Sequence, residues 1–416
     1  MSPDRSARTP RRRGARWLFG AALVVAQLLL PIGTASTSAS STAPTTAALR
    51  ICTDCSDYGL ADASRYRYVI LHSWEGPLAR RLKAQSPNVR VLVYENVSAT
   101  VANACHAGVD DRALPAGIGY CWADRNHPSW FLTDRGGRRL EFCDYRGLWL
   151  MDVGNDAYQR RWLDDVAAAA RAGGFDGVFL DDVNQNADAH LCGRSIAKYP
   201  REAGYSGAMT RFLARVGKGL QARGLLALPN IMIRNWWEPG GVALFQRWIE
   251  STSGAMQEYY AKQGHGPSGW YTDDGGWHND WSYRQQLLKR TEAAGKIFVG
   301  LTYAPSDDLR SQRYARASFL ADWDGGPSAL AFEPTDPEQQ DPYRIQWTAD
   351  LGSPLGPRAR VGLAWRRDFS RGAVVVNPST TTQTVELGAH FVGEDGSAVT
   401  SVTLQPADAA ILYNAR

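Results

Sequence analysis

The sequence predicts an α/β fold, a (β/α)8 TIM barrel followed by a C-terminal β-sandwich. Three observations lead to this prediction. The chain has 416 residues, of which 44% are hydrophobic and 21% charged, a composition typical of globular proteins. Short apolar runs alternate with longer amphipathic segments over residues 63–350, as in repeated β-α units. After Pro354 the pattern changes to short alternating segments, which indicates a small β domain over residues 355–416.

Residues 1–40 are predicted to form a signal peptide. An arginine-rich start is followed by an apolar run from Trp17 to Leu30 and then by small residues. Gln27 and Pro31 keep the uninterrupted apolar run short for a membrane span, so we expect cleavage and export rather than a membrane anchor. Residues 41–62 begin in a stretch rich in Ser, Thr and Ala and are predicted to be a flexible lead-in. The mature protein is therefore predicted to be secreted and not bound to a membrane.

The formal net charge of +4 comes from the predicted signal peptide. Its six arginines and one aspartate carry a net charge of +5, which leaves about −1 for the rest of the chain. Nucleic-acid binding depends on a basic surface that neutralises phosphates. We therefore expect no nucleic-acid partner.

Six cysteines in an exported chain predict three disulfides, because an oxidising compartment converts neighbouring thiols into bridges. They are Cys52, Cys55, Cys105, Cys121, Cys143 and Cys192. A structural zinc site around the Cys52-x-x-Cys55 pair is the weaker alternative, because the chain has no second pair of this kind. The pairing of the six cysteines is left open by the sequence.

Eight apolar runs are predicted to be the barrel strands, at residues 68–72, 89–94, 148–152, 177–181, 226–230, 254–258, 297–302 and 329–333. Between them lie helix candidates such as the segment in which Tyr158, Trp162 and Val166 repeat at helical spacing. Eight strands in about 270 residues suit a TIM barrel. An open doubly wound sheet is the alternative, but no G-x-G-x-x-G follows the first run.

Residues 97–147 have no clear periodicity and contain three of the cysteines. We predict a disulfide-pinned insertion that covers part of the barrel mouth.

Many of the runs end in polar or acidic residues. In a parallel barrel all strands point the same way, so their carboxyl ends and the following loops meet on one face, where active sites lie. Any single residue of this kind could instead cap a helix. Several together are harder to explain as caps.

The pair formed by Asp181, with its neighbour Asp182, and Glu258 is the predicted catalytic centre. Glycosidic cleavage needs two carboxyl groups, one that donates a proton to the leaving oxygen and one that attacks or stabilises the anomeric carbon. A divalent-metal site formed by Asp152, Asp181 and Asp182 is the alternative. The chain has no D-x-D-x-D-G loop, so we predict neither a metal nor another cofactor.

Polar and aromatic side chains at the strand ends and in loops are predicted to bind the substrate, because aromatic rings stack on the apolar faces of sugars. They are His72, Trp74, Glu95, Asp152, Asn230, Trp236, Tyr260, Tyr303 and Glu333. For each loop tryptophan, packing in the core is an equal alternative. The isolated histidines His106, His190 and His265 are interpreted as surface or structural residues.

Residues 174–184 (GFDGVFLDDVN) resemble the fourth-strand motif of a group of secreted TIM-barrel glycoside hydrolases. This group includes hypothetical glycosyl-hydrolase-like families related to the endo-α-1,4-polygalactosaminidases and, more distantly, to the melibiase-type α-galactosidases. Residues 254–260 (GAMQEYY) resemble the sixth-strand motif, and residues 151–155 (MDVGN) with Tyr158 resemble the end of the third strand. The resemblance covers about residues 66–333 and not the C-terminal tail.

The resemblance implies that Asp181 is the strand-four catalytic aspartate and Glu258 the strand-six acid. Asp182 stands where the relatives often have asparagine, so the choice between Asp181 and Asp182 stays open. If the reaction retains the anomeric configuration, Asp181 would be the nucleophile and Glu258 the general acid/base.

We therefore expect a secreted glycoside hydrolase that cleaves a poly- or oligosaccharide by two-carboxylate catalysis. Retention of configuration is favoured, and the sequence leaves inversion open. Two alternatives remain: a catalytically inactive barrel that binds glycans, and, with less support, a metal-dependent polysaccharide deacetylase. The sequence does not identify the sugar, the linkage or the oligomeric state.

Overall fold

The computed structural model describes residues 44–51, 60, 62–234, 237–273, 280–335 and 344–415. The predicted signal peptide, Cys52, Cys55 and Trp236 lie outside these residues. Among the described helices, none has both the length and the apolar character needed to cross a membrane.

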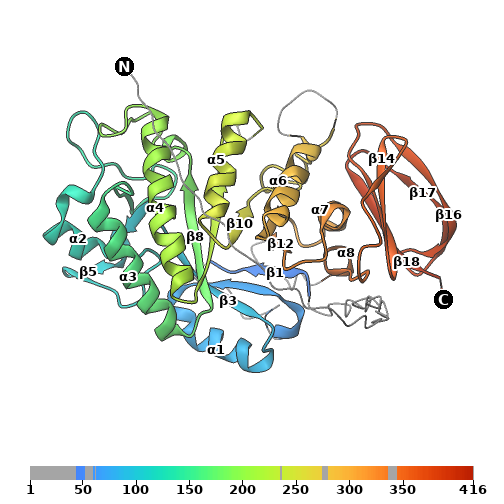
Figure 1. The fold of residues 1–416 in the computed structure, drawn as a ribbon, viewed down its shortest axis with the longest axis horizontal. Coiled ribbons are helices and arrows are strands. Elements are labelled where there is room, and N and C mark those ends of the chain that lie inside the picture. The colour runs from blue at the N-terminus through green and yellow to red at the C-terminus, as the bar shows by residue number, and fades with distance from the viewer. Residues whose placement is uncertain are drawn as a thin grey trace, which may run out of the picture. The chain divides into compact units, whose positions relative to one another are not determined.

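Eight parallel strands close into a barrel, which confirms the predicted (β/α)8 fold (Figure 1). In chain order they are β1 (Thr46–Leu49), β2 (Tyr68–Leu71), β3 (Arg90–Asn96), β8 (Gly177–Asn184), β9 (Leu226–Met232), β10 (Gly254–Gln257), β11 (Ile297–Ala304) and β12 (Ala329–Pro334). The barrel closes where β1 pairs with both β2 and β12.

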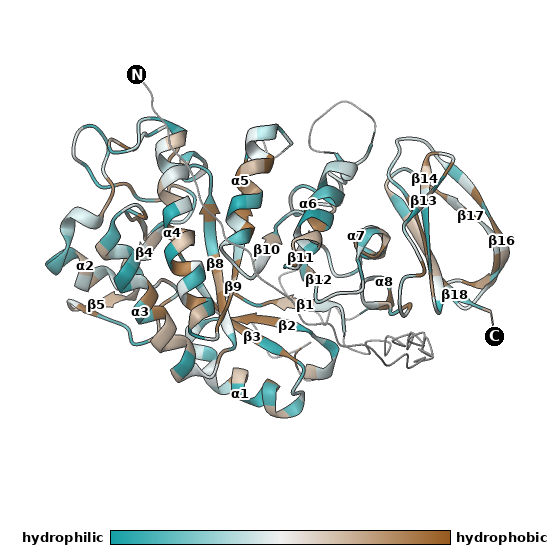
Figure 2. Ribbon diagram, in the orientation of Figure 1, coloured by the Kyte–Doolittle hydropathy of each residue, from teal (hydrophilic) through white to brown (hydrophobic). Residues whose placement is uncertain are grey.

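Helices surround the barrel and pack one apolar stripe each against it. They are α1 (Gly76–Gln85), α3 (Asp156–Gly173), α4 (Glu202–Ala222), α5 (Pro239–Glu250), α6 (Trp281–Ala293), α7 (Leu309–Asp322) and the short α8 (Ile345–Thr348). Helix α3 shows why these segments form. Asn155 caps its first turn, Gly174 ends it in a left-handed conformation, and Tyr158, Trp162 and Val166 are buried on one side. Figure 2 shows the resulting contrast between apolar strands and helices with polar outer faces.

Two separate sets of apolar side chains hold the barrel together. Ile70, Leu92, Phe179, Leu228 and Val299 belong to a cluster that fills the barrel interior. A larger cluster lies between the strands and the helices. Because both faces of each strand are buried, the strands are nearly continuous apolar runs, and the sequence pattern shows them clearly.

One predicted barrel strand is wrong, and an unpredicted strand takes its place. Residues 148–150 form β7 (Leu148–Leu150), which pairs antiparallel with β4 (Ala99–Val101) outside the barrel. The missing barrel strand is β1, which lies in the predicted flexible lead-in. β1 consists of Thr-Ala-Ala-Leu, too short and too weakly apolar to stand out from the Ser, Thr and Ala residues before it. The two errors cancel, so residues 177–184 are still the fourth strand and residues 254–257 the sixth.

The segment between β3 and β7 is an insertion, as predicted. Besides β4 it contains β5 (Cys105–His106), β6 (Val109–Asp110) and α2 (Tyr120–Asn126), together with 3₁₀ turns at Ala102–Ala104 and Pro128–Trp130. The disulfide Cys105–Cys121 lies within it, and Cys143–Cys192 joins its end to the loop that follows β8. Two disulfides are thus confirmed. Among the described residues, the only cluster with metal-ligand geometry is Cys105, Asp110 and Cys121, whose two cysteines are already bonded to each other.

The C-terminal region is an antiparallel β domain with its own apolar core. Its strands are β13 (Ala359–Val361), β14 (Ala364–Phe369), β15 (Gly372–Asn377), β16 (Gln383–Val392), β17 (Ala398–Leu404) and β18 (Asp408–Asn414). They form one six-stranded sheet in the order β13-β14-β15-β18-β16-β17. β16 pairs with both β17 and β18 and shifts register between Glu386 and Phe391. Arg313 of α7 pairs with Asp408 and Glu394 and fixes this domain to the barrel.

Candidate active site

A bulge near the end of β8 turns two consecutive aspartates toward the same cavity. The register between β8 and β9 shifts between Leu180 and Val183, and Asp182 adopts a left-handed backbone with φ of +58°. Side chains in a regular strand alternate between its faces, but a bulge breaks this alternation. Aspartate tolerates the left-handed region better than most residues. As a result, Asp181 and Asp182 both line a cavity of about 520 Å³ at the carboxyl ends of the strands.

The side-chain amide of Asn230 joins the two predicted catalytic carboxyl groups. Its Nδ2 lies 3.1 Å from Oδ1 of Asp181 and 2.8 Å from Oε2 of Glu258. Because both oxygens accept from one nitrogen atom, they are at most about 5.9 Å apart. These side chains come from the fourth, fifth and sixth strands of the barrel. The structure therefore brings Asp181 and Glu258 together across one cavity, although they are far apart in the sequence.

Each of these carboxylates also accepts a hydrogen bond from a tyrosine. Tyr94 of β3 donates to Oδ2 of Asp181 at 2.7 Å, and Tyr303 of β11 donates to Oε1 of Glu258 at 2.9 Å. Both oxygens of Asp181 and both oxygens of Glu258 are thus held by donors from neighbouring strands. This fixes the orientation of both carboxylates within the barrel mouth.

Burial raises the pKa of Asp181 to about 7, and the neighbouring charges of Asp182 and Glu258 add to this effect. The hydrogen bonds from Tyr94 and Asn230 oppose the rise, because they favour the ionised form. The carboxyl group of Asp181 therefore changes its charge near neutral pH. A perturbed pKa of this kind in a cleft is typical of an active site.

Asp182 has a different set of partners. Asn96 donates to its Oδ2 at 2.5 Å, and Nε2 of His190 lies 3.3 Å from its Oδ1. The other ring nitrogen of His190 lies 2.9 Å from Oδ2 of Asp144. Burial alone would lower the pKa of His190, but hydrogen bonds and charges from Asp182 and Asp144 raise it to about 9. A histidine that is positively charged at neutral pH thus balances Asp182.

Covalent and stacking contacts hold His190 in place. Its ring stacks on Phe142 with centroids 4.3 Å apart and an interplanar angle of 2°. The Cys143–Cys192 disulfide joins the two loops that carry Asp144 and His190. The interpretation of His190 as a surface or structural histidine missed its place in the cavity wall. The sequence could not place His190 beside Asp144, because this contact depends on the Cys143–Cys192 pairing, which the sequence leaves undetermined.

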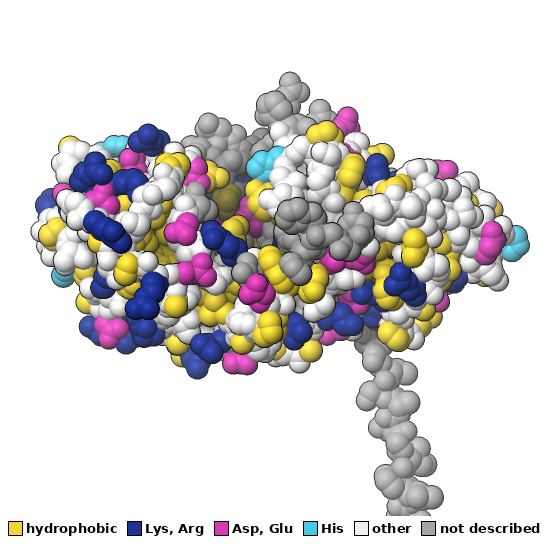
Figure 3. Space-filling model, turned by 90° about the horizontal axis from the view of Figure 1, so that it is seen from above, with side chains coloured by type: hydrophobic (Ala, Val, Ile, Leu, Met, Phe, Trp, Pro, Cys, Tyr) yellow, Lys and Arg dark blue, Asp and Glu magenta, His cyan; other side chains and the backbone are white. Residues whose placement is uncertain are grey.

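Three of the predicted substrate-binding residues line this cavity: His72, Asn230 and Tyr303. Trp74 lies beside it and stacks on His72, with ring centroids 4.0 Å apart and 44% of its surface exposed. Figure 3 views the face toward which β8 points and shows a hollow with acidic and apolar side chains around it.

Three predicted substrate-binding residues do not line the cavity, and these assignments are corrected. Glu95 lies between Tyr94 and Asn96 on β3, so strand alternation turns it to the opposite side, into a separate cavity beside α3. Burial raises the pKa of Glu95 well above its usual value. Tyr260 is buried between the barrel strands and the helices, where its hydroxyl donates a hydrogen bond to Gln285.

Asp152 is the third. Asp152 follows β7, not a barrel strand, and accepts hydrogen bonds from Lys198 and Tyr199. This position also takes Asp152 out of the alternative metal site with Asp181 and Asp182. Glu333 lies near the end of β12, in register with the cavity residue Tyr303 and on the same face of the strand as the interior residues Ala329 and Ala331. Burial raises the pKa of Glu333 to about 8, against the opposing charge of Arg50. Its role in substrate binding stays a prediction.

Several cavity residues escaped prediction, among them Tyr94, Tyr145 and Tyr259, and Asn96 was indicated only as a polar residue at a strand end. Alternation along β3 could have indicated Tyr94 and Asn96, because both lie on the same face of the strand as the apolar interior residue Leu92. Tyr145 and Tyr259 lie in loops, for which the sequence carries no such signal.

A closed parallel barrel that presents paired carboxyl groups from its fourth and sixth strands has the architecture of a glycoside hydrolase. The family comparison agrees. The chain belongs to hypothetical glycosyl hydrolase family 15 (GHL15), whose family model matches residues 83–373. The resemblance stated from the sequence is thus confirmed, and the protein is a glycoside hydrolase.

A comparison with solved structures finds the following three among its matches. Ega3 of Aspergillus fumigatus, in complex with galactosamine, is 13% identical, covering 64% of this chain and 78% of that chain, with a TM-score of 0.36. The noncanonic maltogenic α-amylase AmyB of Thermotoga neapolitana is 11% identical, covering 89% and 99%, with a TM-score of 0.49. A GH31 family sulfoquinovosidase from E. rectale is 10% identical, covering 90% and 62%, with a TM-score of 0.46. No curated protein matches the chain.

Proposed function

We propose that this protein is an exported glycoside hydrolase that cleaves a poly- or oligosaccharide with retention of configuration. Asp181 acts as the nucleophile and Glu258 as the general acid/base. The observation that carries this proposal is the bridge through Asn230, whose amide nitrogen lies within hydrogen-bond distance of one oxygen of each carboxyl group. The two disulfides support export, because such bonds persist in oxidising compartments.

The separation of the carboxyl groups favours retention over inversion. Retaining enzymes place them about 5–5.5 Å apart, whereas inverting enzymes leave about 6.5–9.5 Å for a water molecule. The bridged oxygens of Asp181 and Glu258 cannot be more than about 5.9 Å apart. This bound applies to one oxygen of each group, and we take the donor that they share as support for the shorter separation.

The reaction proceeds in two steps with these residues. An oxygen of ionised Asp181 attacks the anomeric carbon while the glycosidic bond breaks, and protonated Glu258 gives its proton to the leaving oxygen. In the second step ionised Glu258 takes a proton from water, and the hydroxide oxygen bonds the anomeric carbon as the bond to Asp181 breaks. The two inversions restore the original configuration, and both carboxyl groups return to their starting states.

The surrounding donors have distinct tasks in this scheme. Tyr94 and Asn230 hold the Asp181 carboxylate and stabilise its charge when it leaves the sugar. Tyr303 orients Glu258 toward the linkage. Asp182 is tied to Asn96 and His190, and this leaves Asp181 as the proposed nucleophile of the two aspartates.

Chemical rescue tests the roles separately. With a glycoside carrying a good leaving group, Asp181→Gly in sodium azide is expected to form a glycosyl azide of inverted configuration. Glu258→Ala is expected to form one of retained configuration. NMR of the first sugar product of the wild type should show the substrate's own anomeric configuration.

Three results would contradict the proposal: an inverted first product, exchanged rescue products, or full activity in either variant. A barrel that binds glycans without cleaving them would show saturable binding by calorimetry and no new reducing ends across a panel of cell-surface polysaccharides.

A further inference from the structure

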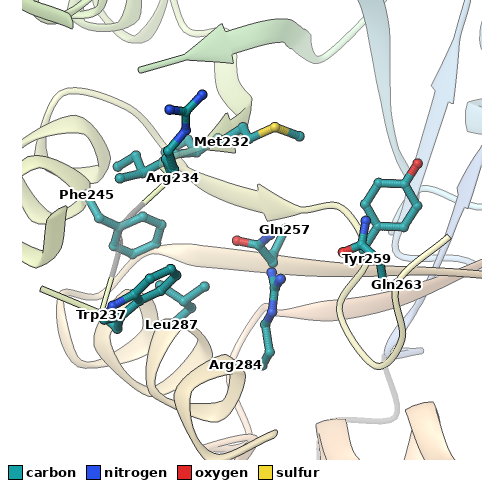
Figure 4. Close-up of a pocket in the computed structure, with 11 residues that line it drawn as sticks. Met232, Arg234, Trp237, Phe245, Gln257, Tyr259, Gln263, Arg284 and Leu287 are labelled. Atoms are coloured by element: carbon teal, nitrogen blue, oxygen red, sulfur yellow. The ribbon is translucent and has the colours of Figure 1, made fainter. Parts of the chain in front are cut away.

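A second pocket, of about 210 Å³, adjoins the catalytic cavity (Figure 4). It lies at the carboxyl ends of β9 and β10, between helices α5 and α6. Met232 and Tyr259 line both spaces, so the pocket and the cavity share a wall. Pockets for drug-sized ligands measure roughly 300–1,000 Å³. The smaller volume of this pocket suits one small ring.

The backbone around Glu258 divides the two spaces. Gln257 lines the second pocket, Glu258 lines the catalytic cavity, and Tyr259 lines both. Tyr259 has a φ of +56°, a left-handed conformation that is unfavourable for an aromatic side chain. Strained backbone of this kind persists mainly at functional sites. Here the left-handed backbone allows the side chains of Gln257 and Glu258, which are consecutive in the chain, to line two neighbouring spaces.

The pocket offers the groups that bind a sugar ring. Phe245 and Trp237 supply apolar surface, and Figure 4 shows Gln257 and Arg284 between them and Tyr259. Gln257 uses its amide nitrogen to bond the backbone oxygen of Glu258 at 2.9 Å, so its amide oxygen can accept from a ligand.

Gln263 has the complementary arrangement. Its amide oxygen accepts from the hydroxyl of Tyr271 at 2.7 Å, and Arg284 donates to the same hydroxyl at 2.8 Å. The amide nitrogen of Gln263 can therefore donate to a ligand. A sugar hydroxyl both donates and accepts, and the two glutamines together satisfy both needs.

We propose that this pocket is a subsite for the leaving-group sugar of the substrate, next to the bond that is cleaved. The inference rests on the proposed function, because it takes Glu258 as the proton donor to the leaving oxygen. The pocket is lined from β9, β10, α5 and α6, next to Glu258, and not from β8, which carries Asp181. No carboxylate is among its described lining residues, so it binds and does not cleave. The substrate class is then a glycan with a further sugar on the leaving side, not a glycoside of a small alcohol.

Two substrates of the same sugar test this subsite. One is a fluorescently labelled oligosaccharide series from the polysaccharide that the wild type cleaves. The other is the glycosyl fluoride, whose leaving group is a single atom that does not enter the pocket. Gln263→Ala removes one contact, and Gln263→Trp fills the pocket from an exposed position. Gln246→Ala on α5 is the matched control, because Gln246 does not line the pocket.

Gln263→Ala is expected to lower kcat/KM on the oligosaccharides by about tenfold, which is the effect expected from the loss of one hydrogen bond. The loss for Gln263→Trp should be larger. Both variants should stay within twofold of the wild type on the glycosyl fluoride. Gln246→Ala should stay within twofold of the wild type on both substrates. Equal losses on the two substrates, or none on either, overturn the subsite while leaving the proposed function in place.

A binding measurement covers the case in which the wild type cleaves nothing, which would overturn the proposed function. Calorimetry with cello-, xylo-, malto- and chito-hexaose then serves as the readout. Binding that Gln263→Trp weakens at least tenfold supports a sugar site in this pocket. Unchanged binding in that variant, or no binding of any of the four by the wild type, counts against it.

Discussion

Asp152 and Asp181 look alike in the sequence, since each ends an apolar run that is predicted to be a barrel strand. In the structure they have opposite surroundings. Asp152 follows β7 of a two-stranded antiparallel sheet, pairs with Lys198 and accepts a hydrogen bond from Tyr199. Asp181 ends the regular part of a barrel strand, where its partners are Tyr94, Asn230 and nearby acids. The comparison shows that an aspartate at a strand end gains a chemical role from the sheet it joins, because only the barrel brings other strand ends to meet it.

The largest expected effect is the difference in kcat between a variant of Asp181 in the barrel and a variant of Asp152 beside the antiparallel sheet. Asp181→Asn should lower kcat by about 10⁴-fold, because removal of a nucleophile eliminates the covalent route. Asp152→Asn should leave kcat within about threefold, since Asp152 is not in the cavity wall. Steady-state hydrolysis of one substrate by both purified variants checks this. A similar loss in the two variants would remove the distinction between the regions.

The bridge through Asn230 sharpens the comparison, because nothing equivalent joins Asp152 to another acid. Asn230→Ala should lower kcat by about 100-fold, the size of effect expected when reacting groups move by about 1 Å. Because Asn230 neither attacks the anomeric carbon nor transfers a proton in the proposed mechanism, the wild-type anomeric product should be kept. A kcat within twofold of the wild type would show that the bridge has no catalytic importance.

The pH dependence of kcat/KM tests the electrostatics around Asp181. The pKa of Asp181 is raised to about 7, and the nucleophile must be ionised, so activity should rise with pH through about 7. Asp182→Asn removes a neighbouring negative charge and should move this limb to lower pH. His190→Gln removes the balancing positive charge from Asp182 and should move it to higher pH. If both variants shift the limb in the same direction, this account of the charges is wrong.

The smallest expected effect concerns stability. Asp152→Ala leaves the groups that bond it without their buried partner, which should cost about 1–3 kcal/mol of unfolding free energy. Urea denaturation followed by circular dichroism measures this, with Asp164→Ala, an exposed acid paired with Arg223, as the control that should change little. If the unfolding free energy changes equally in Asp152→Ala and Asp164→Ala, burial does not increase the contribution of Asp152 to stability.

Much of the barrel could be predicted from the sequence because strands buried on both faces are continuous apolar runs. Seven of the eight barrel strands follow from this pattern, and β1 does not, because Thr-Ala-Ala-Leu carries too little apolar signal. The pattern also misassigned β7, since a short apolar run fits a barrel strand and an antiparallel ribbon equally well. Local pattern indicates that a strand forms, and long-range pairing decides which sheet it joins.

The sequence by itself determined the fold class, the alternation of strands and helices, and the two acids at the ends of the fourth and sixth strands. Only the tertiary structure decided which acids meet. The bulge at Asp182, the reach of Asn230 between Asp181 and Glu258, and the disulfide beside His190 all join residues that are distant in the chain or break the regular alternation of a strand. Periodicity records which face of an element is buried. The distance between two side chains on different elements depends on closure of the barrel.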